Sequence, residues 1–301
     1  MIIHNLLTPF LDSLRRWQKP PKLEEFVEGY FRHVQPWVEN SFFVEDARDF
    51  HSAIEDLNWD LYRVEALALD PAKEEARLKK NIQGVEALFG FELQGEAILF
   101  SALAMMDGYA RFDRGTHRVF LGVDESHGRG AYLDILITHE LTHVARESRP
   151  SVWEGWGINP LMTHDEFGES QPVIEHVFGE GFSCAVSELL VPGEDHWHYA
   201  YQTQDTLAQA LEHGPAIDRR IKQEIKMPHA TSDYTRLYNP AQYGARVPPY
   251  AQYVWGWQWA KQLLRERAGM DPAKLVWVCS RELVESAMSF ELKELAPAYS
   301  I

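Results

Sequence analysis

Apolar residues recur at three- and four-residue intervals along most of the chain, which is the pattern of amphipathic helices. Three short apolar or alternating runs, EAILFSAL, GYARF and RVFLGVD, interrupt this pattern and are typical of β-strands. The helical pattern covers residues 23–38, 47–67, 72–89, 131–147, 172–190, 199–226, 249–268 and 271–296, the last with a break. The sequence therefore predicts an α+β protein that is mostly helical, with a small sheet whose three strands form a meander.

Two segments differ from this pattern. Residues 1–17 are apolar in places but have no basic start before the apolar run and no small-residue cleavage site, so they predict a first helix and not a signal peptide. Residues 148–170 are rich in Gly, Pro and Trp and lack periodicity, which predicts a long loop that serves as a lid or a binding wall. No stretch reaches the length of a transmembrane span.

Composition and charge narrow the function classes. The 301 residues include 45 acidic and 29 basic side chains, for a net charge of −16. This excess of acid argues against a general affinity for nucleic acid or for anionic membranes, because both need a basic face. It favours neutral or basic substrates instead. Two cysteines, Cys184 and Cys279, cannot provide a disulfide framework for a chain of this size, so we expect a reducing, cytoplasmic location.

The strongest chemical signal is the sequence ITHELTHVA, in which His139, Glu140 and His143 form an H-E-x-x-H motif. Residues four apart lie on the same face of a helix, so both imidazoles can bind one metal ion while Glu140 faces a water bound to it. A carboxylate among the apolar residues of this helix is costly to bury unless it has a partner or a catalytic task. The pattern therefore predicts a zinc site with Glu140 as general base. The alternative is a motif that arises by chance from the composition.

A catalytic zinc usually has three protein ligands, so one more donor must come from another segment. Glu180 is the strongest candidate, because Gly179 and Gly181 beside it allow another helix to approach closely. The alternative is an ordinary acidic residue near a helix start, where the helix dipole favours it. Glu175 and His176, one turn earlier, are the main competitors. The other candidates are His164, Asp165, Glu166, Glu169, Glu188, His196 and His198, of which the last two are expected in a surface loop.

These residues resemble the gluzincins, metallopeptidases whose zinc ligands are the two histidines of H-E-x-x-H and a glutamate on a later helix. In many members that glutamate begins a Glu-Gly-x-Ala/Ser segment, and Glu180-Gly181-Phe182-Ser183 matches it. More closely, the chain resembles a bacterial family of predicted Zn-dependent proteases. The run ILF…DGYARF…RVFLGVD, the EGFS helix and the later Tyr253-Val254-Trp255-Gly256 carry this resemblance, which covers roughly residues 95–290.

The resemblance implies that His139, His143 and Glu180 bind zinc, that Glu140 is the general base and that Tyr253 stabilises the oxyanion. The chain departs from thermolysin-like members in two respects. The spacing from His143 to Glu180 is long, and the position four after Glu180 is a cysteine, Cys184, in place of an aspartate that orients a zinc-binding histidine. Another partner for that histidine is therefore expected. The candidates are Ser183, Ser187 and a backbone carbonyl.

The assignment of the tyrosine has several alternatives, because most tyrosines in a chain are packing residues. Those closest to Tyr253 in the sequence are Tyr234, Tyr238, Tyr243 and Tyr250. Arg246 is a further candidate for holding a carboxylate or carbonyl of the substrate.

The sequence thus predicts two regions and one main function. Residues 1–92 form an N-terminal helical region, and residues 93–301 form a zincin-like catalytic domain, with the sheet and the motif helix in 93–147 and a helical lobe in 148–301. The predicted function is zinc-dependent hydrolysis of peptide bonds in a peptide or protein substrate, with RVFLGVD or GYARF offering a strand edge to the extended chain. The alternatives are a binding or regulatory protein with a non-catalytic zinc, and a metal-dependent hydrolase of non-peptide substrates.

Overall fold

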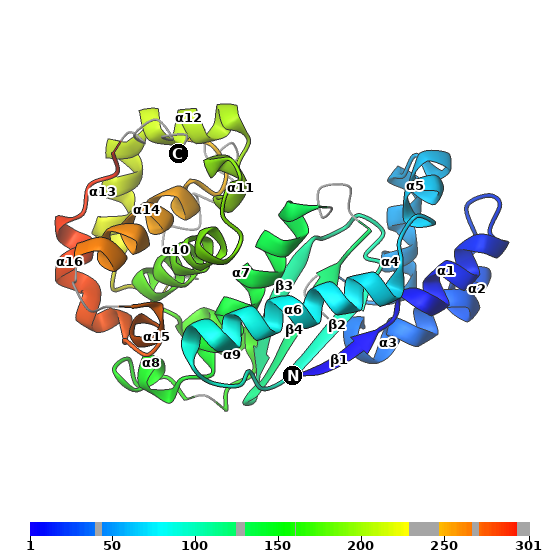
Figure 1. Ribbon diagram of the computed structural model, residues 1–301, viewed down its shortest axis with the longest axis horizontal. Helices are drawn as coiled ribbons and strands as arrows, with labels where there is room; N and C mark the ends of the chain where they lie inside the picture. The colour runs from blue at the N-terminus through cyan, green and yellow to red at the C-terminus, as the bar shows by residue number, and fades with distance from the viewer. Residues whose placement is uncertain (40–43, 125–129, 160, 229–246, 267–270, 294–301) are drawn as a thin grey trace.

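A four-stranded mixed sheet lies in the middle of the computed structural model, and helices cover both of its faces (Figure 1). The strands β1 and β4 pair in parallel with β2, and β3 pairs antiparallel with β4, so β3 forms an edge of the sheet. The strands are β1 (Ile2–Asn5), β2 (Glu96–Phe100), β3 (Gly108–Asp113) and β4 (Thr116–Gly122), in the spatial order β1-β2-β4-β3. The structure describes residues 1–39, 44–124, 130–159, 161–228, 247–266 and 271–293.

The prediction that the strands form a meander is wrong. β2 pairs in parallel with β4, with Ile98 opposite Phe120, and β3 lies outside this pair. A tight turn at Arg114 and Gly115, both with positive φ, returns the chain from β3 to β4. The chain therefore forms β3 at the edge of the sheet first and then turns back to form β4, which lies between β2 and β3.

The prediction of a helix at the N-terminus is correct only from Leu7 onward, where α1 (Leu7–Arg16) begins. Residues 2–5 form β1, with Ile3 opposite Ala97 of β2. Four residues are too few to show a helical or strand period, so pairing with β2 decides their conformation.

The sheet is buried on both faces because its two central strands send alternate side chains into two cores. Ile98, Phe100 and Phe120 pack on one side against the helices of the N-terminal part. On the other side, Leu99 and Leu121 pack against longer helices. Strands covered on both faces are apolar throughout, as these runs are. The N-terminal helical segments are α1, α2 (Leu23–Phe26), the π-helical turn η1 (Val27–Phe31), α3 (Arg32–Val38), α4 (Ala47–Ser52), the 3-10 turn η2 (Ala53–Asp56) and α5 (Trp59–Ala66).

Two long helices, α6 (Pro71–Phe89) and α7 (Ala131–Glu147), cover the other face of the sheet. The side chain of Asp70 caps the first turn of α6, and Gly90, in the left-handed conformation, ends it. α7 carries the H-E-x-x-H motif and is buried on most of its circumference. It lies between the sheet and the C-terminal helices, so its motif faces the junction of the two.

The C-terminal helices gather around α10 (Val173–Leu190), which packs against α7. α14 (Ala251–Glu266) crosses α10 where a Cβ on Gly181 would lie 1.9 Å from the carbonyl carbon of Gly256. Only glycine permits such an approach, so the close contact predicted for Gly181 is confirmed. The remaining C-terminal segments are α11 (His196–Tyr199), α12 (Gln204–Glu212), α13 (Gly214–Glu224), α15 (Pro272–Leu275), the 3-10 turn η7 (Ser280–Leu283) and α16 (Val284–Ser289).

The long loop predicted for residues 148–170 is wrong in part, because it contains α8 (Pro150–Glu154) and α9 (His164–Ser170). α9 begins with a capping box in which the side chains of Thr163 and Glu166 accept hydrogen bonds from each other's backbone amides. Helices of five and seven residues are too short to show a clear hydrophobic period, which explains why the pattern missed them.

The single helix predicted for residues 199–226 is two helices, α12 and α13, which meet at His213 just before Pro215. His196 and His198, expected in a surface loop, lie in the one-turn helix α11. The break predicted in the last helical stretch is confirmed by the separation of α15 from α16.

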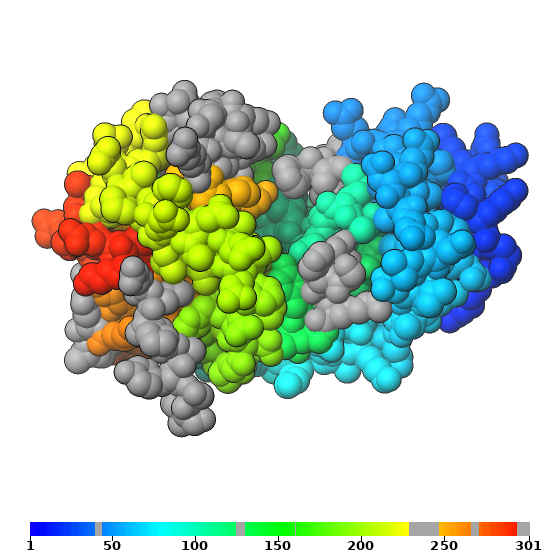
Figure 2. All heavy atoms as spheres, turned by 90° about the horizontal axis from the view of Figure 1, so that it is seen from above, coloured from blue at the N-terminus to red at the C-terminus, as the bar shows by residue number. Residues whose placement is uncertain are grey.

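The predicted fold class, an α+β protein dominated by helix with a small sheet, is confirmed. The N-terminal helices and the C-terminal helices lie at opposite ends of the molecule, with the sheet and α7 between them (Figure 2). None of the described helices combines the length and the apolar character needed to cross a membrane. The division into regions at residue 92 stays a prediction.

Candidate metal centre

Three side chains from α7 and α10 converge where α7 packs against the C-terminal helices. His139 and His143 lie one turn apart on α7, and Glu180 faces them from α10. Oε2 of Glu180 lies 3.1 Å from Nε2 of His139 and 3.3 Å from Nε2 of His143, and the two Nε2 atoms are 3.1 Å apart. Among the described residues, these three form a group that could hold a metal ion.

The spacing of the three atoms fits a tetrahedral ion. Ligands bound at about 2.0–2.1 Å in that geometry lie about 3.3 Å from one another, close to the separations of 3.1 to 3.3 Å between these atoms. Two imidazole nitrogens this close repel each other unless a cation or a shared proton lies between them. Within the described residues no fourth His, Cys, Asp or Glu joins the group. One tetrahedral position is therefore left for water or substrate.

Burial and mutual charge shift the ligand pKa values in opposite directions. Burial lowers the pKa of His139. Burial also disfavours a charged His143, but the negative charge of Glu180 and its hydrogen bond outweigh burial and raise the pKa of His143 to about 9. Burial opposes ionisation of Glu180 as well, yet the charge of His143 and hydrogen bonds from both histidines hold its pKa well below the usual range. The site thus stabilises a positive charge where a metal ion would lie.

Each histidine also has a neighbour at its other ring nitrogen. Sγ of Cys184 lies 3.8 Å from Nδ1 of His139, at the range of a weak sulfur hydrogen bond. Oε1 of Glu147, one turn further along α7, lies 3.8 Å from Nδ1 of His143. Such neighbours orient the rings of metal-binding histidines.

Of the three partners expected in place of the aspartate, neither Ser183 nor Ser187 contacts a motif histidine. The hydroxyl of Ser187 donates to the backbone carbonyls of Ile135 and Ser183. The buried hydroxyl of Ser183 has no partner in the described part of the chain. Cys184 itself contacts His139. Residues four apart lie on the same face of a helix, so Cys184 faces the site from α10 as Glu180 does.

Glu140 lies beside the ligand group, against the edge of the sheet. The backbone amide of Ala110 in β3 donates to its carboxylate. A Cβ on Gly108 would lie 3.1 Å from its Cγ, so glycine at that position lets α7 approach the edge strand. Burial raises the pKa of Glu140 to about 7. A carboxyl group with this pKa is suited to accept and return a proton near neutral pH.

The main competitors for the third ligand position have other partners. Glu175 is buried in an ion pair with Arg146, with contacts of 2.6 and 2.8 Å. Nε2 of His176 lies 3.6 Å from Oε1 of Glu180, the oxygen that is not shared with the two motif histidines. His176 therefore lies beside the metal group without belonging to it.

The remaining candidates lie outside the group. His164 contacts the hydroxyl of Tyr109 and the carbonyl of Phe112, and so covers one end of β3. Glu188 binds Lys261 and the indole of Trp257. The others are Asp165, Glu166 and Glu169 on exposed positions of α9, and His196 and His198 in α11, where they contact Trp257 and Glu194.

Replacement of Glu180 tests this ligand set. Glu180→Ala is expected to lose stoichiometric zinc, because two histidines alone hold the ion poorly. His176→Ala, one turn away on the same helix, is the matched control and is expected to keep a full equivalent. Elemental analysis after exhaustive dialysis measures both. Zinc retained by Glu180→Ala and lost from His176→Ala would contradict the assignment.

Tyr253 lies next to the metal group. Its ring stacks on that of His139, with ring centres 6.1 Å apart, and its hydroxyl donates to Glu180. Burial raises its pKa well above the usual value, so the hydroxyl stays protonated and able to donate. Tyr250 lines the same cleft. The other candidates, Tyr234, Tyr238, Tyr243 and Arg246, fall outside the described residues.

Tyr201, which the sequence reasoning missed, is also part of this site. Its ring stands edge-on to His139, with ring centres 4.8 Å apart, and packs against Tyr253. Its φ is 52°, a strained value for a residue other than glycine. Its buried hydroxyl has no hydrogen-bond partner among the described residues. A tyrosine two residues after Tyr199, in the segment HWHYAY, gives no sequence signal for such a position.

A cleft of about 560 Å³ opens over the metal group. The edge of β3 at Gly108–Ala110 forms one wall, and α7, α9 and α10 form the others. On the far side of Glu140 a further hollow continues toward Tyr132 and Tyr201. The metal group therefore lies in the middle of an elongated depression, with room for a chain on both sides.

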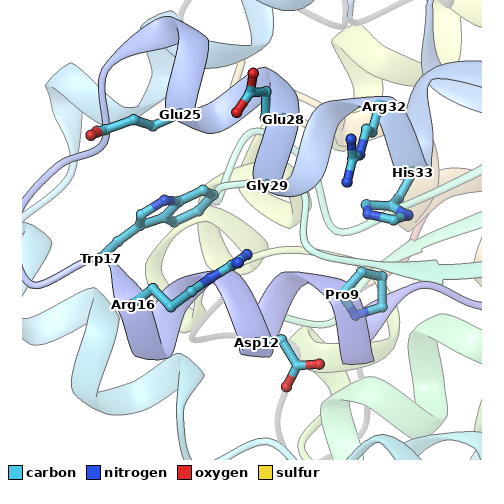
Figure 3. A pocket seen from close by; sticks show the side chains of 9 residues that line it. All are labelled: Pro9, Asp12, Arg16, Trp17, Glu25, Glu28, Gly29, Arg32 and His33. Carbon is cyan, nitrogen blue, oxygen red and sulfur yellow. The ribbon is translucent and has the colours of Figure 1, made fainter.

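A larger but shallow hollow of about 790 Å³ lies in the N-terminal helices, between α1 and the turn η1 (Figure 3). Its charged side chains are mixed in sign and exposed, as for Arg16, Glu28 and Arg32. They do not converge on a common point as the metal group does, so the smaller cleft is the chemically organised one.

Comparisons of the chain with protein-family models, curated proteins and solved structures find no significant match. The resemblance to the gluzincins thus stays a prediction.

Proposed function

We propose that this chain is a zinc-dependent metallopeptidase of zincin-like fold, with His139, His143 and Glu180 as ligands and Glu140 as general base. The observation that carries the proposal is the triangle of ligand atoms at tetrahedral spacing, open on the side of a cleft that also holds a carboxyl group of raised pKa. Two histidines and a carboxylate are a donor set that suits zinc.

The chain's own residues provide the acid–base chemistry. Zinc bound here would polarise the scissile carbonyl and lower the pKa of a water molecule to about 7. Glu140 accepts the proton of the attacking water and returns it to the leaving amine. Tyr201, or Tyr253 once its hydroxyl turns away from Glu180, donates a hydrogen bond to the oxyanion, since both hydroxyls are protonated and lie at the site.

The edge strand supports a peptide as substrate. Within the described part of the chain, β3 pairs with no strand on its cleft side, and Gly108–Ala110 line the cleft. An extended peptide can add to such an edge through backbone hydrogen bonds, independently of its sequence. The strand GYARF takes this role, because RVFLGVD forms β4 inside the sheet.

A peptide mixture tests the proposal directly. Zinc-loaded protein is expected to cleave members of a diverse peptide library, to stop when a chelator removes the metal and to recover when zinc returns. Mass spectrometry identifies the products. A zinc-loaded protein that cleaves no peptide would contradict the proposal, and hydrolysis of esters or amides of other kinds in its place would identify a non-peptide hydrolase.

A further inference from the structure

A carboxylate that pairs with no lysine or arginine of the described residues lies in the cleft one turn beyond the metal group. Glu147 follows His143 by four residues on α7, so it lies on the same face of the helix. Its side chain is only 15% exposed. Within the described residues, its carboxylate is paired with no lysine or arginine, and its recorded charged contact is Nδ1 of His143 at 3.8 Å. A buried carboxylate is costly unless a cation compensates it.

The arginine in the wall of the cleft is already paired. Arg146 is the arginine that lines it, and its guanidinium is held by Glu175 and by the carbonyls of Leu275 and Val278. The two charges of a bound zinc ion would be offset by the carboxylates of Glu140 and Glu180. No lysine or arginine of the described residues pairs with Glu147, so a cationic ligand can take that place.

The surroundings of Glu147 suit a long side chain that ends in a cation. Tyr109 and Phe167 provide aromatic walls along this end of the cleft. A Cβ on Gly168 would meet nothing within 4 Å, and one on Gly179 would meet only the His143 ring at 3.8 Å, so space remains beside them. Lysine and arginine place their aliphatic stems on such surfaces and their charge at a carboxylate.

The rim of the cleft is also negatively charged. α9 forms this rim and carries Asp165, Glu166 and Glu169 at exposed positions. The whole chain has a net charge of −16. Such a field attracts cationic ligands from a distance and concentrates them at the cleft.

We infer that this end of the cleft is a binding subsite for a lysine or arginine side chain of the substrate, and that Glu147 receives its charge. The inference rests on the proposed peptidase function and names its substrate class. A lysine or arginine two residues from the scissile bond would reach this end if the peptide extends along β3, because strands advance about 3.3 Å per residue and one helical turn is about 5.4 Å.

Matched peptides measure the preference. A cleaved peptide is made with lysine or with norleucine, its neutral analogue, at each position on either side of the scissile bond. At one position the wild type is expected to favour lysine in kcat/KM by about 10- to 100-fold, the range for a charge-assisted hydrogen bond. Glu147→Gln, which keeps a hydrogen-bond acceptor beside His143, is expected to bring that ratio close to one. Glu55→Gln, an exposed carboxylate in η2 away from the cleft, is the control and should keep it.

The kinetic outcomes separate a subsite from a purely structural role. If Glu147→Gln lowers kcat/KM for both peptides equally, Glu147 only orients His143 and the inference is overturned. A wild type that treats lysine and norleucine alike at every position overturns it as well.

A binding measurement gives a second readout that needs no turnover. Peptide hydroxamates bearing lysine or norleucine at the preferred position are titrated into zinc-loaded Glu140→Gln protein by calorimetry. The lysine compound is expected to bind about 10-fold or more tightly, and the added Glu147→Gln change should remove the difference. Equal binding of both compounds overturns the subsite and leaves the peptidase proposal intact. Failure of the wild type to cleave any peptide, with zinc bound, contradicts the peptidase proposal itself.

Discussion

Glu140→Gln is expected to bind a full equivalent of zinc and to hydrolyse peptides about 10²- to 10⁴-fold more slowly than the wild type. That loss corresponds to roughly 3 to 5 kcal/mol of activation free energy. The ligands would be unaffected, because Glu140 does not belong to the triangle formed by His139, His143 and Glu180. A glutamine of the same shape can still accept the hydrogen bond from the Ala110 amide, but it cannot take a proton.

Zinc content and kcat/KM, measured on the same preparation, separate the possible outcomes. Glu55→Gln, exposed in η2 away from the cleft, controls for the general loss of one negative charge. Undiminished turnover by Glu140→Gln would show that the chemistry occurs elsewhere. A zinc-loaded wild type without activity, whose fourth metal position is filled by a side chain in a crystal structure, would favour a binding or regulatory protein.

The metal ligands could be predicted because two of the three lie close together in the sequence. His139 and His143 are four residues apart on one helix, so their convergence follows from helical geometry alone. Glu180 is distant in sequence, but Gly181 beside it indicated a close helix crossing, and α14 does cross there. The tetrahedral spacing of the three atoms, in contrast, depends on how α7 packs against α10, which no spacing in the sequence specifies.

The surroundings of the group could not be predicted because they depend on contacts between distant segments. Tyr201 reaches His139 from a strained position after α11. Gly108 and Ala110 reach Glu140 from the edge strand. Their positions depend on β3 lying outside the β2–β4 pair, and the alternation of apolar residues is the same in a meander and in this order.

The elements of the fold differ in the same way: those whose limits are marked in the sequence were predicted, and those that depend on tertiary contacts were not. Long elements such as α6 were predicted almost to the residue, because a proline at its start and Gly90 at its end mark its limits. Short elements were missed or misassigned, since β1, α8 and α9 have four to seven residues and tertiary pairing decides their form.

Glu175 illustrates how a ligand candidate in the sequence can be a structural residue. Its carboxylate and the Arg146 guanidinium are each 1% exposed and meet through contacts of 2.6 and 2.8 Å. The same guanidinium lies 4.4 Å from the centre of the Phe178 ring and donates to the carbonyls of Leu275 and Val278. One buried ion pair thus joins α7, α10 and the segment around α15.

Arg146→Ala is therefore expected to lower the free energy of unfolding by about 3 to 5 kcal/mol, because it leaves the Glu175 carboxylate buried without a counter-charge. Urea denaturation followed by circular dichroism measures the change. Arg15→Ala, which breaks the exposed pair with Asp12, is the matched control and should leave the unfolding midpoint unchanged.

A double variant keeps this prediction testable if Arg146→Ala does not fold. Arg146→Met combined with Glu175→Leu removes both buried charges and fills their space with apolar side chains. It is expected to recover most of the lost stability, since desolvation of the pair offsets much of its attraction. It should also keep zinc, because neither residue is a ligand. A single variant within about 1 kcal/mol of the wild type, or a double variant as unstable as the single one, would show that the ion pair does not hold α7 to α10.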